Sequence, residues 1–181
     1  MKEVLFYILL TLIGKVYTLF PSKTYEARFI SFNASSDDIC DFSQMRFLGR
    51  ENRANGTVEL KKDLSNELYS VSAESYIDSN GDGEYKLLPF SVPQQPICGA
   101  MESYWSYVDA TLKYEVNTNF PVHIRPCPVP KGVYYFKDVL IKTDDWPVVM
   151  PRGYLKGVAT LFKNAKFVGR IEIVSHITDI A

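Results

Sequence analysis

The chain has 181 residues, with 20 Lys and Arg against 21 Asp and Glu, so its formal net charge is −1 at neutral pH. This length suffices for one domain with its own hydrophobic core, and the balanced charge argues against a nucleic-acid partner. Aromatic residues make up 14% of the chain, which favours β-strands and apolar contact surfaces.

The first segment has the pattern of a secretory signal peptide. Lys2 precedes an apolar run over residues 4–13, which is too short to span a bilayer but matches the hydrophobic region of a signal peptide. We place the signal peptide at residues 1–18, with the cleavage site fixed only to within a few residues. A retained signal anchor is the alternative. The expected mature protein, residues 19–181, is a single secreted, extracellular domain.

The first half of the mature chain has the pattern of short strands separated by turns. The spacing of these segments is typical of an antiparallel sandwich or barrel. The strand-like segments are residues 24–35, 42–50, 56–62, 67–77 and 84–90, and the last of them is closed by a proline.

Two N-glycosylation sequons begin at Asn33 and Asn55. We expect Asn55 to lie at a hairpin tip between residues 42–50 and 56–62, where a glycan would be accessible. Both sequons agree with secretion.

The sequence DSNGDGEY, residues 78–85, resembles the first half of an EF-hand calcium loop. Such a loop has oxygen ligands at its first, third and fifth positions, glycine at the sixth and glutamate at the twelfth. The first four requirements are met, but the twelfth residue is Pro89, which has no side-chain oxygen. Asn-Gly and Asp-Gly pairs between two strands are a strong hairpin signal instead. We therefore predict a hairpin, with its acidic groups exposed, and no metal site.

One segment, residues 98–117, has helical periodicity. Its apolar side chains recur at three- and four-residue steps, which places them on one stripe of a helix. We predict an amphipathic helix that closes one side of the core, and the alternative is that its Trp and Tyr side chains line or gate an apolar cavity. The stripe consists of Met101, Tyr104, Trp105, Val108 and Leu112.

Strands resume in the last third of the chain. Residues 132–142 are apolar on both faces, so we expect a strand that is buried from both sides. An apolar loop follows between two prolines, which cannot continue a central strand. The strand pattern of residues 154–177 then predicts a hairpin, with its turn near residues 163–166.

Catalysis finds little support in the sequence. The histidines are His123 and His176, and there is no nucleophile elbow, glycine-rich phosphate loop or paired metal-ligand spacing. Asp144 and Asp145 have the groups for acid–base chemistry, but adjacent loop carboxylates are more often solvated. We expect no enzymatic activity, no cofactor and no metal.

In an oxidising compartment, three cysteines can form one disulfide, and one cysteine then remains outside it. We favour a disulfide between Cys98 and Cys127. Cys40 is then a buried thiol or a partner in an intermolecular bond.

The segment from residue 127 to 162 carries a family resemblance. A Cys-Pro pair, Lys131-Gly132 before an aromatic strand, and the sequence PRGY opening the next strand resemble a large secreted insect family related to the ML-type lipid-recognition proteins. The stretch DDWPVVMPRGYLKG is similar to the insect CheB chemosensory proteins, which are themselves similar to the ganglioside activator protein.

This resemblance implies an all-β, immunoglobulin-like β-sandwich, shaped as an ML-like β-cup around an apolar cavity. It also implies a disulfide between Cys98 and Cys127 and the binding of lipid or lipid-like ligands. For CheB-type members it implies expression in gustatory sensilla and detection of cuticular hydrocarbon pheromones.

We therefore expect a secreted, glycosylated β-sandwich with one amphipathic helix packed at its cavity, which binds a hydrophobic small molecule or lipid in gustatory chemosensation. One alternative is a glycolipid-presenting or lipid-transfer activator that inserts the loop 146–150 into a membrane surface. The other is a signalling or interaction module that contacts a receptor without a lipid ligand. The residues expected at the cavity or its rim are Tyr104, Trp105, Val108, Leu112, Tyr134, Phe136, Trp146, Val149 and Met150.

Overall fold

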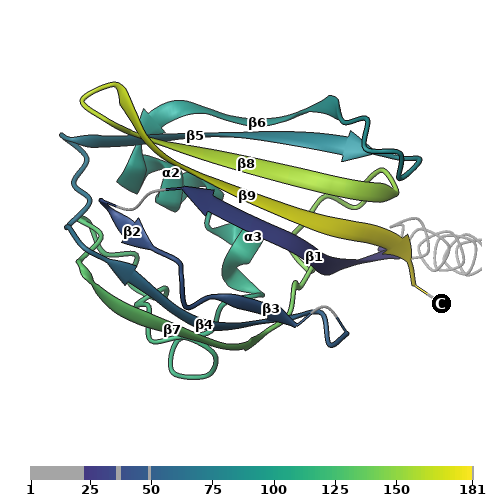
Figure 1. Ribbon diagram of the computed structural model, residues 1–181, viewed down its shortest axis with the longest axis horizontal. Coiled ribbons are helices and arrows are strands. Elements are labelled where there is room, and N and C mark those ends of the chain that lie inside the picture. Colours follow the sequence, from purple (N-terminus) through teal and green to yellow (C-terminus); the bar gives the residue numbers. More distant parts are fainter. Residues whose placement is uncertain (1–22, 36–37, 49, 181) are drawn as a thin grey trace, which may run out of the picture.

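The computed structural model describes residues 23–35, 38–48 and 50–180, and the predicted signal peptide lies outside these residues. Two antiparallel sheets face each other as a sandwich, which confirms the all-β fold class (Figure 1). One sheet consists, in spatial order, of β1 (Tyr25–Ser35), β9 (Lys166–Asp179), β8 (Gly153–Lys163), β5 (Tyr69–Asp78) and β6 (Lys86–Pro96). In the second sheet, β4 (Arg53–Leu60) pairs with β2 (Cys40–Asp41), β3 (Arg46–Leu48) and β7 (Gly132–Val139).

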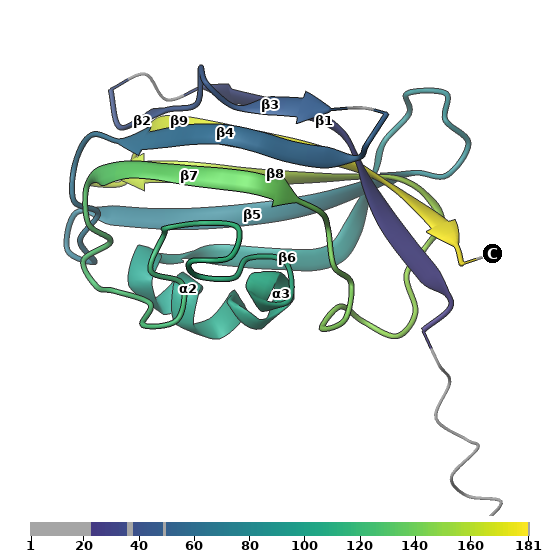
Figure 2. The ribbon, with the colours of Figure 1, turned by 90° about the horizontal axis from the view of Figure 1, so that it is seen from below.

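Two short helices, α2 (Ile97–Tyr104) and α3 (Ser106–Asp109), replace the single long helix expected from the periodicity. Figure 2 shows them beside β6, at the edge of the five-stranded sheet. The chain leaves the helical path after α3 because Asn117 supplies competing hydrogen bonds. Its side chain accepts from the Lys113 N–H and donates to the Thr111 carbonyl oxygen, each at 2.8 Å. Among the described residues, no helix is long and apolar enough to cross a membrane.

The strand β7 is covered on one face only, so the expectation that it is buried from both sides is wrong. Tyr134 and Phe136 are partly buried on the inner face, whereas Val133 and Tyr135 on the outer face are 58% and 37% exposed. The reason is that no described helix or strand packs extensively on the outer face of β7. Its apolar outer residues are solvent-facing and do not indicate a third layer.

The expectation that Asn55 lies at a hairpin tip is also wrong. The chain turns between Leu48 and Arg53, with Asn52 at a φ of 53°. Asn55 lies within β4, opposite Arg46. The glycine after it serves a close approach rather than a turn, because a Cβ at Gly56 would lie 2.1 Å from the carbonyl oxygen of Gln44.

The hairpin predicted at residues 78–85 is confirmed and joins β5 to β6. Its first carboxylate is not exposed as expected, because Asp78 is only 3% accessible. Among the described residues, no three His, Cys, Asp or Glu side chains are grouped where they could hold a metal ion. The strand β6 continues past Pro89 to Pro96, which is possible because it is an edge strand. The turn between β8 and β9 at residues 164–165 is also as predicted.

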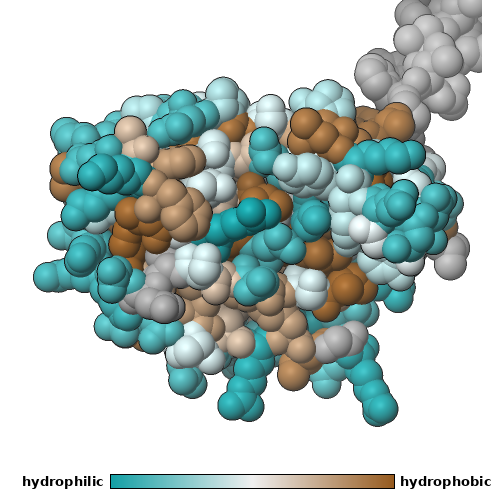
Figure 3. Space-filling model, turned by 45° about the horizontal axis from the view of Figure 1, so that its top comes forward, coloured by the Kyte–Doolittle hydropathy of each residue, from teal (hydrophilic) through white to brown (hydrophobic). Residues whose placement is uncertain are grey.

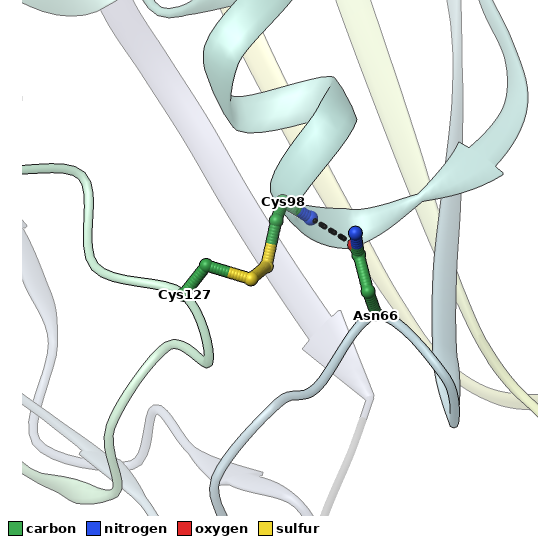
Figure 4. Close-up of a disulfide and its surroundings, with 3 residues drawn as sticks. All are labelled: Asn66, Cys98 and Cys127. Carbon is green, nitrogen blue, oxygen red and sulfur yellow. Dashed lines mark hydrogen bonds between the residues drawn. A yellow bond between two sulfur atoms is a disulfide. The ribbon is translucent and has the colours of Figure 1, made fainter.

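The predicted disulfide is confirmed. Cys98 in the first turn of α2 bonds to Cys127 in the segment before β7, with their Cα atoms 5.8 Å apart (Figure 4). The backbone N–H of Cys98 also donates to the side-chain oxygen of Asn66 at 2.9 Å. The start of α2 is therefore fixed to two other parts of the chain. Cys40 is partly buried against the core.

Among the described residues, the buried core contains two separate clusters at different places along the strands. On β8, Leu161 packs on the first cluster and Leu155 on the second, with Gly157 and Ala159 between them. The first cluster contains Ile39, Leu60, Leu64, Tyr69 and Val129. The second contains Tyr25, Ala27, Met150 and Ile177.

Candidate ligand-binding pocket

A pocket of about 520 Å³ lies between the five-stranded sheet, the two helices and the β7–β8 loop. Its lining is mainly apolar, with serine and tyrosine hydroxyls and the Trp146 indole N–H as the polar side-chain groups, and none of these described lining residues is charged. The lining residues are Ala73, Ser75, Pro89, Phe90, Ser91, Val92, Tyr104, Tyr107, Val108, Trp146, Pro147, Met150 and Leu155.

Small side chains on β5 form part of the pocket wall. Ala73 and Ser75 lie two residues apart and therefore project from the same face of the strand. Val92 of β6 pairs with Ala73 and also lines the pocket, as does Leu155 of β8. The short side chains of β5 leave room that larger residues would occupy.

The helices contribute aromatic side chains to another wall. Tyr104 ends α2, and Tyr107 follows in α3, with the two rings 6.5 Å apart and nearly parallel. Val108 lies beside them and is 38% exposed. The helix break occurs at Trp105, whose indole N–H donates to the Asp109 carboxylate at 3.2 Å.

The β7–β8 loop forms the remaining wall and is fixed by hydrogen bonds. The Trp146 indole N–H donates to the Tyr107 carbonyl oxygen at 2.8 Å. The Tyr25 hydroxyl donates to the Pro147 carbonyl oxygen at 2.5 Å. Because these bonds connect the loop to α3 and to β1, Trp146 and Pro147 are held against the pocket rather than left mobile in solvent.

Arg152 fixes the end of the same loop. Its guanidinium donates to the Met150 carbonyl oxygen at 2.5 Å, to the Asp179 carboxylate at 2.6 and 2.8 Å, and to the Thr24 hydroxyl at 3.0 Å. It also lies 5.3 Å from the ring centre of Tyr25. Burial raises the pKa of the Tyr25 hydroxyl, and the nearby Arg152 charge opposes this rise. The hydroxyl therefore remains a neutral donor at physiological pH.

Four of the nine side chains expected at the cavity are brought together in this pocket. They come from α2, α3 and the β7–β8 loop, which are distant in sequence. They are Tyr104, Val108, Trp146 and Met150.

The other five expected residues lie outside this lining. Tyr134 contacts Phe120 edge-on at 4.9 Å and packs on the first core cluster, with its hydroxyl bonded to the Pro130 carbonyl oxygen. Val149 projects from the loop and is 78% exposed. The remaining three, which are partly buried away from the lining, are Trp105, Leu112 and Phe136.

Sequence reasoning missed the sheet wall, formed by Ala73, Ser75, residues 89–92 and Leu155. It also missed Tyr107 and Pro147. The prolines of β6 suggested that the strand ends at Phe90, although the alternation of Leu88, Phe90 and Val92 was a usable strand signal. Tyr107 lies off the stripe of a continuous helix. It reaches the pocket because the helix is interrupted at Trp105.

On the face shown in Figure 3, apolar side chains form separate patches among polar ones. That face therefore offers no continuous apolar surface comparable with the lining of the pocket.

No curated protein matches the chain. Residues 71–156 match the model of a family described as a protein of unknown function, DUF1091. This segment runs from β5 to the beginning of β8 and contains every residue that lines the pocket, together with both cysteines of the disulfide.

Proposed function

We propose that the protein binds an uncharged hydrophobic molecule in the pocket and carries it without chemical change. The observation that supports this most directly is the lining, which combines apolar walls with a few hydroxyls and no charge. A volume of about 520 Å³ is within the range of about 300–1,000 Å³ typical of small-molecule sites.

The affinity of such a site comes mainly from removing apolar surface from water. Each buried methylene contributes about 0.8 kcal/mol, so a long alkyl or acyl chain needs no charged anchor. The hydroxyls of Ser75, Tyr104 and Tyr107 are suited to orient one polar group of the ligand.

The biological setting that we propose is a secreted protein of gustatory chemosensation, with a lipid or cuticular hydrocarbon as ligand. Support comes from the resemblance of residues 144–157 to CheB-type proteins, since this segment contains Trp146, Met150 and Leu155 of the lining. A hydrocarbon is uncharged and apolar, as the lining requires.

A second candidate is delivery of the ligand to a membrane. Val148 and Val149 are 47% and 78% exposed, directly beside Trp146, Pro147 and Met150 of the pocket. Such an apolar tip fits contact with a lipid surface during ligand transfer.

The binding proposal is tested with Val108→Lys, because this residue lines the pocket but is exposed enough to be replaced without harming the core. We expect the new charge to reduce uptake of the fluorescent probe N-phenylnaphthylamine at least tenfold. Val116→Lys is the matched control, since Val116 is 74% exposed and does not line the pocket.

Native mass spectrometry of the secreted protein, before and after organic extraction, completes the test. A lipid or hydrocarbon that co-purifies and is removed by extraction supports the proposal. A wild-type protein that carries none and takes up no probe would overturn it and favour an interaction module.

A vesicle assay on the variant Val149→Asp distinguishes ligand carriage in chemosensation from delivery of the ligand to a membrane. If the protein delivers lipid, this variant keeps probe binding but transfers a fluorescent lipid to phosphatidylcholine vesicles more slowly. Equal transfer rates for the variant and the wild type would remove the membrane-delivery candidate.

A further inference from the structure

On β5 and β9, the side chains that face the interior are well buried where they lie near one of the two core clusters. In the middle of each strand, between the clusters, the interior-facing side chains are more exposed. On β9, Ile177 is 1% exposed, whereas Ile173 is 36% exposed. Ile173 is not at an edge, because β9 lies between β1 and β8. Its exposure therefore requires a local explanation.

The strand register shows that Ile173 faces the interior. Ile173 lies opposite Gly157 on β8 and opposite Phe32 on β1, and directly opposed residues project from the same face of a sheet. The Phe32 ring stacks on Phe47 of the second sheet, with ring centres 5.0 Å apart. In a filled sandwich Ile173 would be as inaccessible as Ile177, so open space lies beside it.

Gly157 indicates where this space connects to the pocket. A Cβ placed on Gly157 would meet no atom of another described part of the chain within 4 Å, and the residue does not have the positive φ that favours glycine. Gly157 also lies opposite Ser75 and two residues from Leu155, which both line the pocket. The missing side chain leaves the interior open at this point.

We infer that the pocket continues across the five-stranded sheet, over Gly157, to Ile173. We call this continuation the inner channel. It spans two strand spacings from Ser75, or about 10 Å, and its inner-face residues Ala159, Ile171 and Ile173 are apolar. The inner channel takes the far end of an elongated, unbranched apolar chain, whereas a compact ligand would fill only the outer pocket. This inference rests on the proposed binding function and specifies its ligand class.

The experiment compares chain-length dependence in the wild type and in Gly157→Leu. The ligands are straight-chain primary alcohols from octanol to octadecanol, which compete with N-phenylnaphthylamine. In the wild type, affinity should increase about fourfold per methylene until the inner channel is full. In Gly157→Leu the increase should stop at a shorter chain, while the shortest alcohols bind with unchanged affinity.

Two variants serve as controls. Thr160→Leu adds the same side chain on β8, but it projects from the opposite face to Gly157 and should leave the length dependence unchanged. Ile173→Trp narrows the far end of the inner channel and should lower the binding affinity of only the longest alcohols. Circular dichroism and thermal melting verify that each variant is folded.

The outcomes separate this inference from the proposed function. Identical length dependence in the wild type and in folded Gly157→Leu would overturn the inner channel while leaving the pocket intact. An equal loss of affinity for alcohols of every chain length in Gly157→Leu would also contradict the inner channel. Failure of every alcohol to bind the wild type would overturn the binding function itself.

Discussion

The indole of Trp146 and the backbone of Tyr107 are joined by a hydrogen bond of 2.8 Å, although 39 residues separate them in the sequence. Both residues line the pocket. The bond therefore connects two walls that belong to different parts of the chain, and it holds the β7–β8 loop against α3.

Replacing Trp146 with Phe keeps an aromatic ring but removes this bond. A neutral hydrogen bond contributes about 0.5–1.5 kcal/mol net, so we expect ligand to dissociate about two- to tenfold faster, as measured by stopped-flow displacement of N-phenylnaphthylamine. Trp105→Phe is the control, because that indole is also hydrogen-bonded but does not line the pocket. Equal dissociation rates in both variants would show that the bond does not hold the pocket closed.

The carboxylate of Asp78 stabilises the β5–β6 hairpin by accepting backbone hydrogen bonds. Burial alone would raise the pKa of this carboxyl, but the N–H groups of Gly83, Gly81, Asn80 and Asp82 lower it below the ordinary value of 3.8. The charged form is therefore favoured by folding. Its contribution is complete above pH 3.8 and is lost as the pH falls through the lower pKa of the folded state.

We therefore expect Asp78→Asn to lower the melting temperature at neutral pH, with the difference from wild type shrinking as the pH falls below about 4. Thermal melts across this pH range provide the measurement. Asp82→Asn should have a smaller effect, since Asp82 is exposed and accepts one backbone bond, from Glu84. Probe uptake should be unchanged in both, and a difference that persists undiminished at acid pH would contradict the assignment.

The disulfide links α2 to the segment before β7 across a sequence separation of 29 residues. A cross-link of this length restricts the unfolded chain and contributes about 3–4 kcal/mol. The double variant Cys98→Ser, Cys127→Ser should lose about this much free energy of unfolding in urea titrations. A loss below about 1 kcal/mol would show that the reduced unfolded state retains structure or that the native bond is strained.

The two sequons differ in what their asparagines contact. Asn33 is exposed on β1, whereas the Asn55 side-chain oxygen accepts the backbone N–H of Asp138 at 2.8 Å. In protein made without glycans, Asn55→Gln should lower the free energy of unfolding by about 1 kcal/mol, and Asn33→Gln should be neutral.

Secretion from insect cells, followed by enzymatic removal of N-glycans, tests the modification itself. We expect Asn33→Gln to abolish one glycan-dependent shift in electrophoretic mobility. An unchanged shift pattern in this variant would show that Asn33 is not modified.

The sequence predicted what depends on local chemistry. The turns at residues 78–85 and 163–166 follow from residues suited to tight turns, and strand periodicity predicts most of the two sheets. The strand β7 shows the limit of this reasoning. Its apolar outer residues, Val133 and Tyr135, cannot reveal whether another layer covers them.

The pocket depended on tertiary relationships that periodicity does not contain. Phe90 belongs to it because β6 is an edge strand that tolerates proline, and edge position is a property of the whole sheet. Tyr107 belongs to it because the helix is interrupted. No sequence pattern identifies Gly157, because its contribution to the pocket is the space left by its missing side chain.

The separation of the core into two clusters has a thermodynamic consequence. If the proposed ligand is seated between them, it completes the apolar contacts of the sandwich, and unfolding must release it. Occupancy is then coupled to folding, with a gain of about 2.7 kcal/mol when free ligand is at a hundred times its dissociation constant. On the proposed function, the loaded and the stripped protein would be two species of different stability, and the melting temperature of a preparation would report how much ligand it carries.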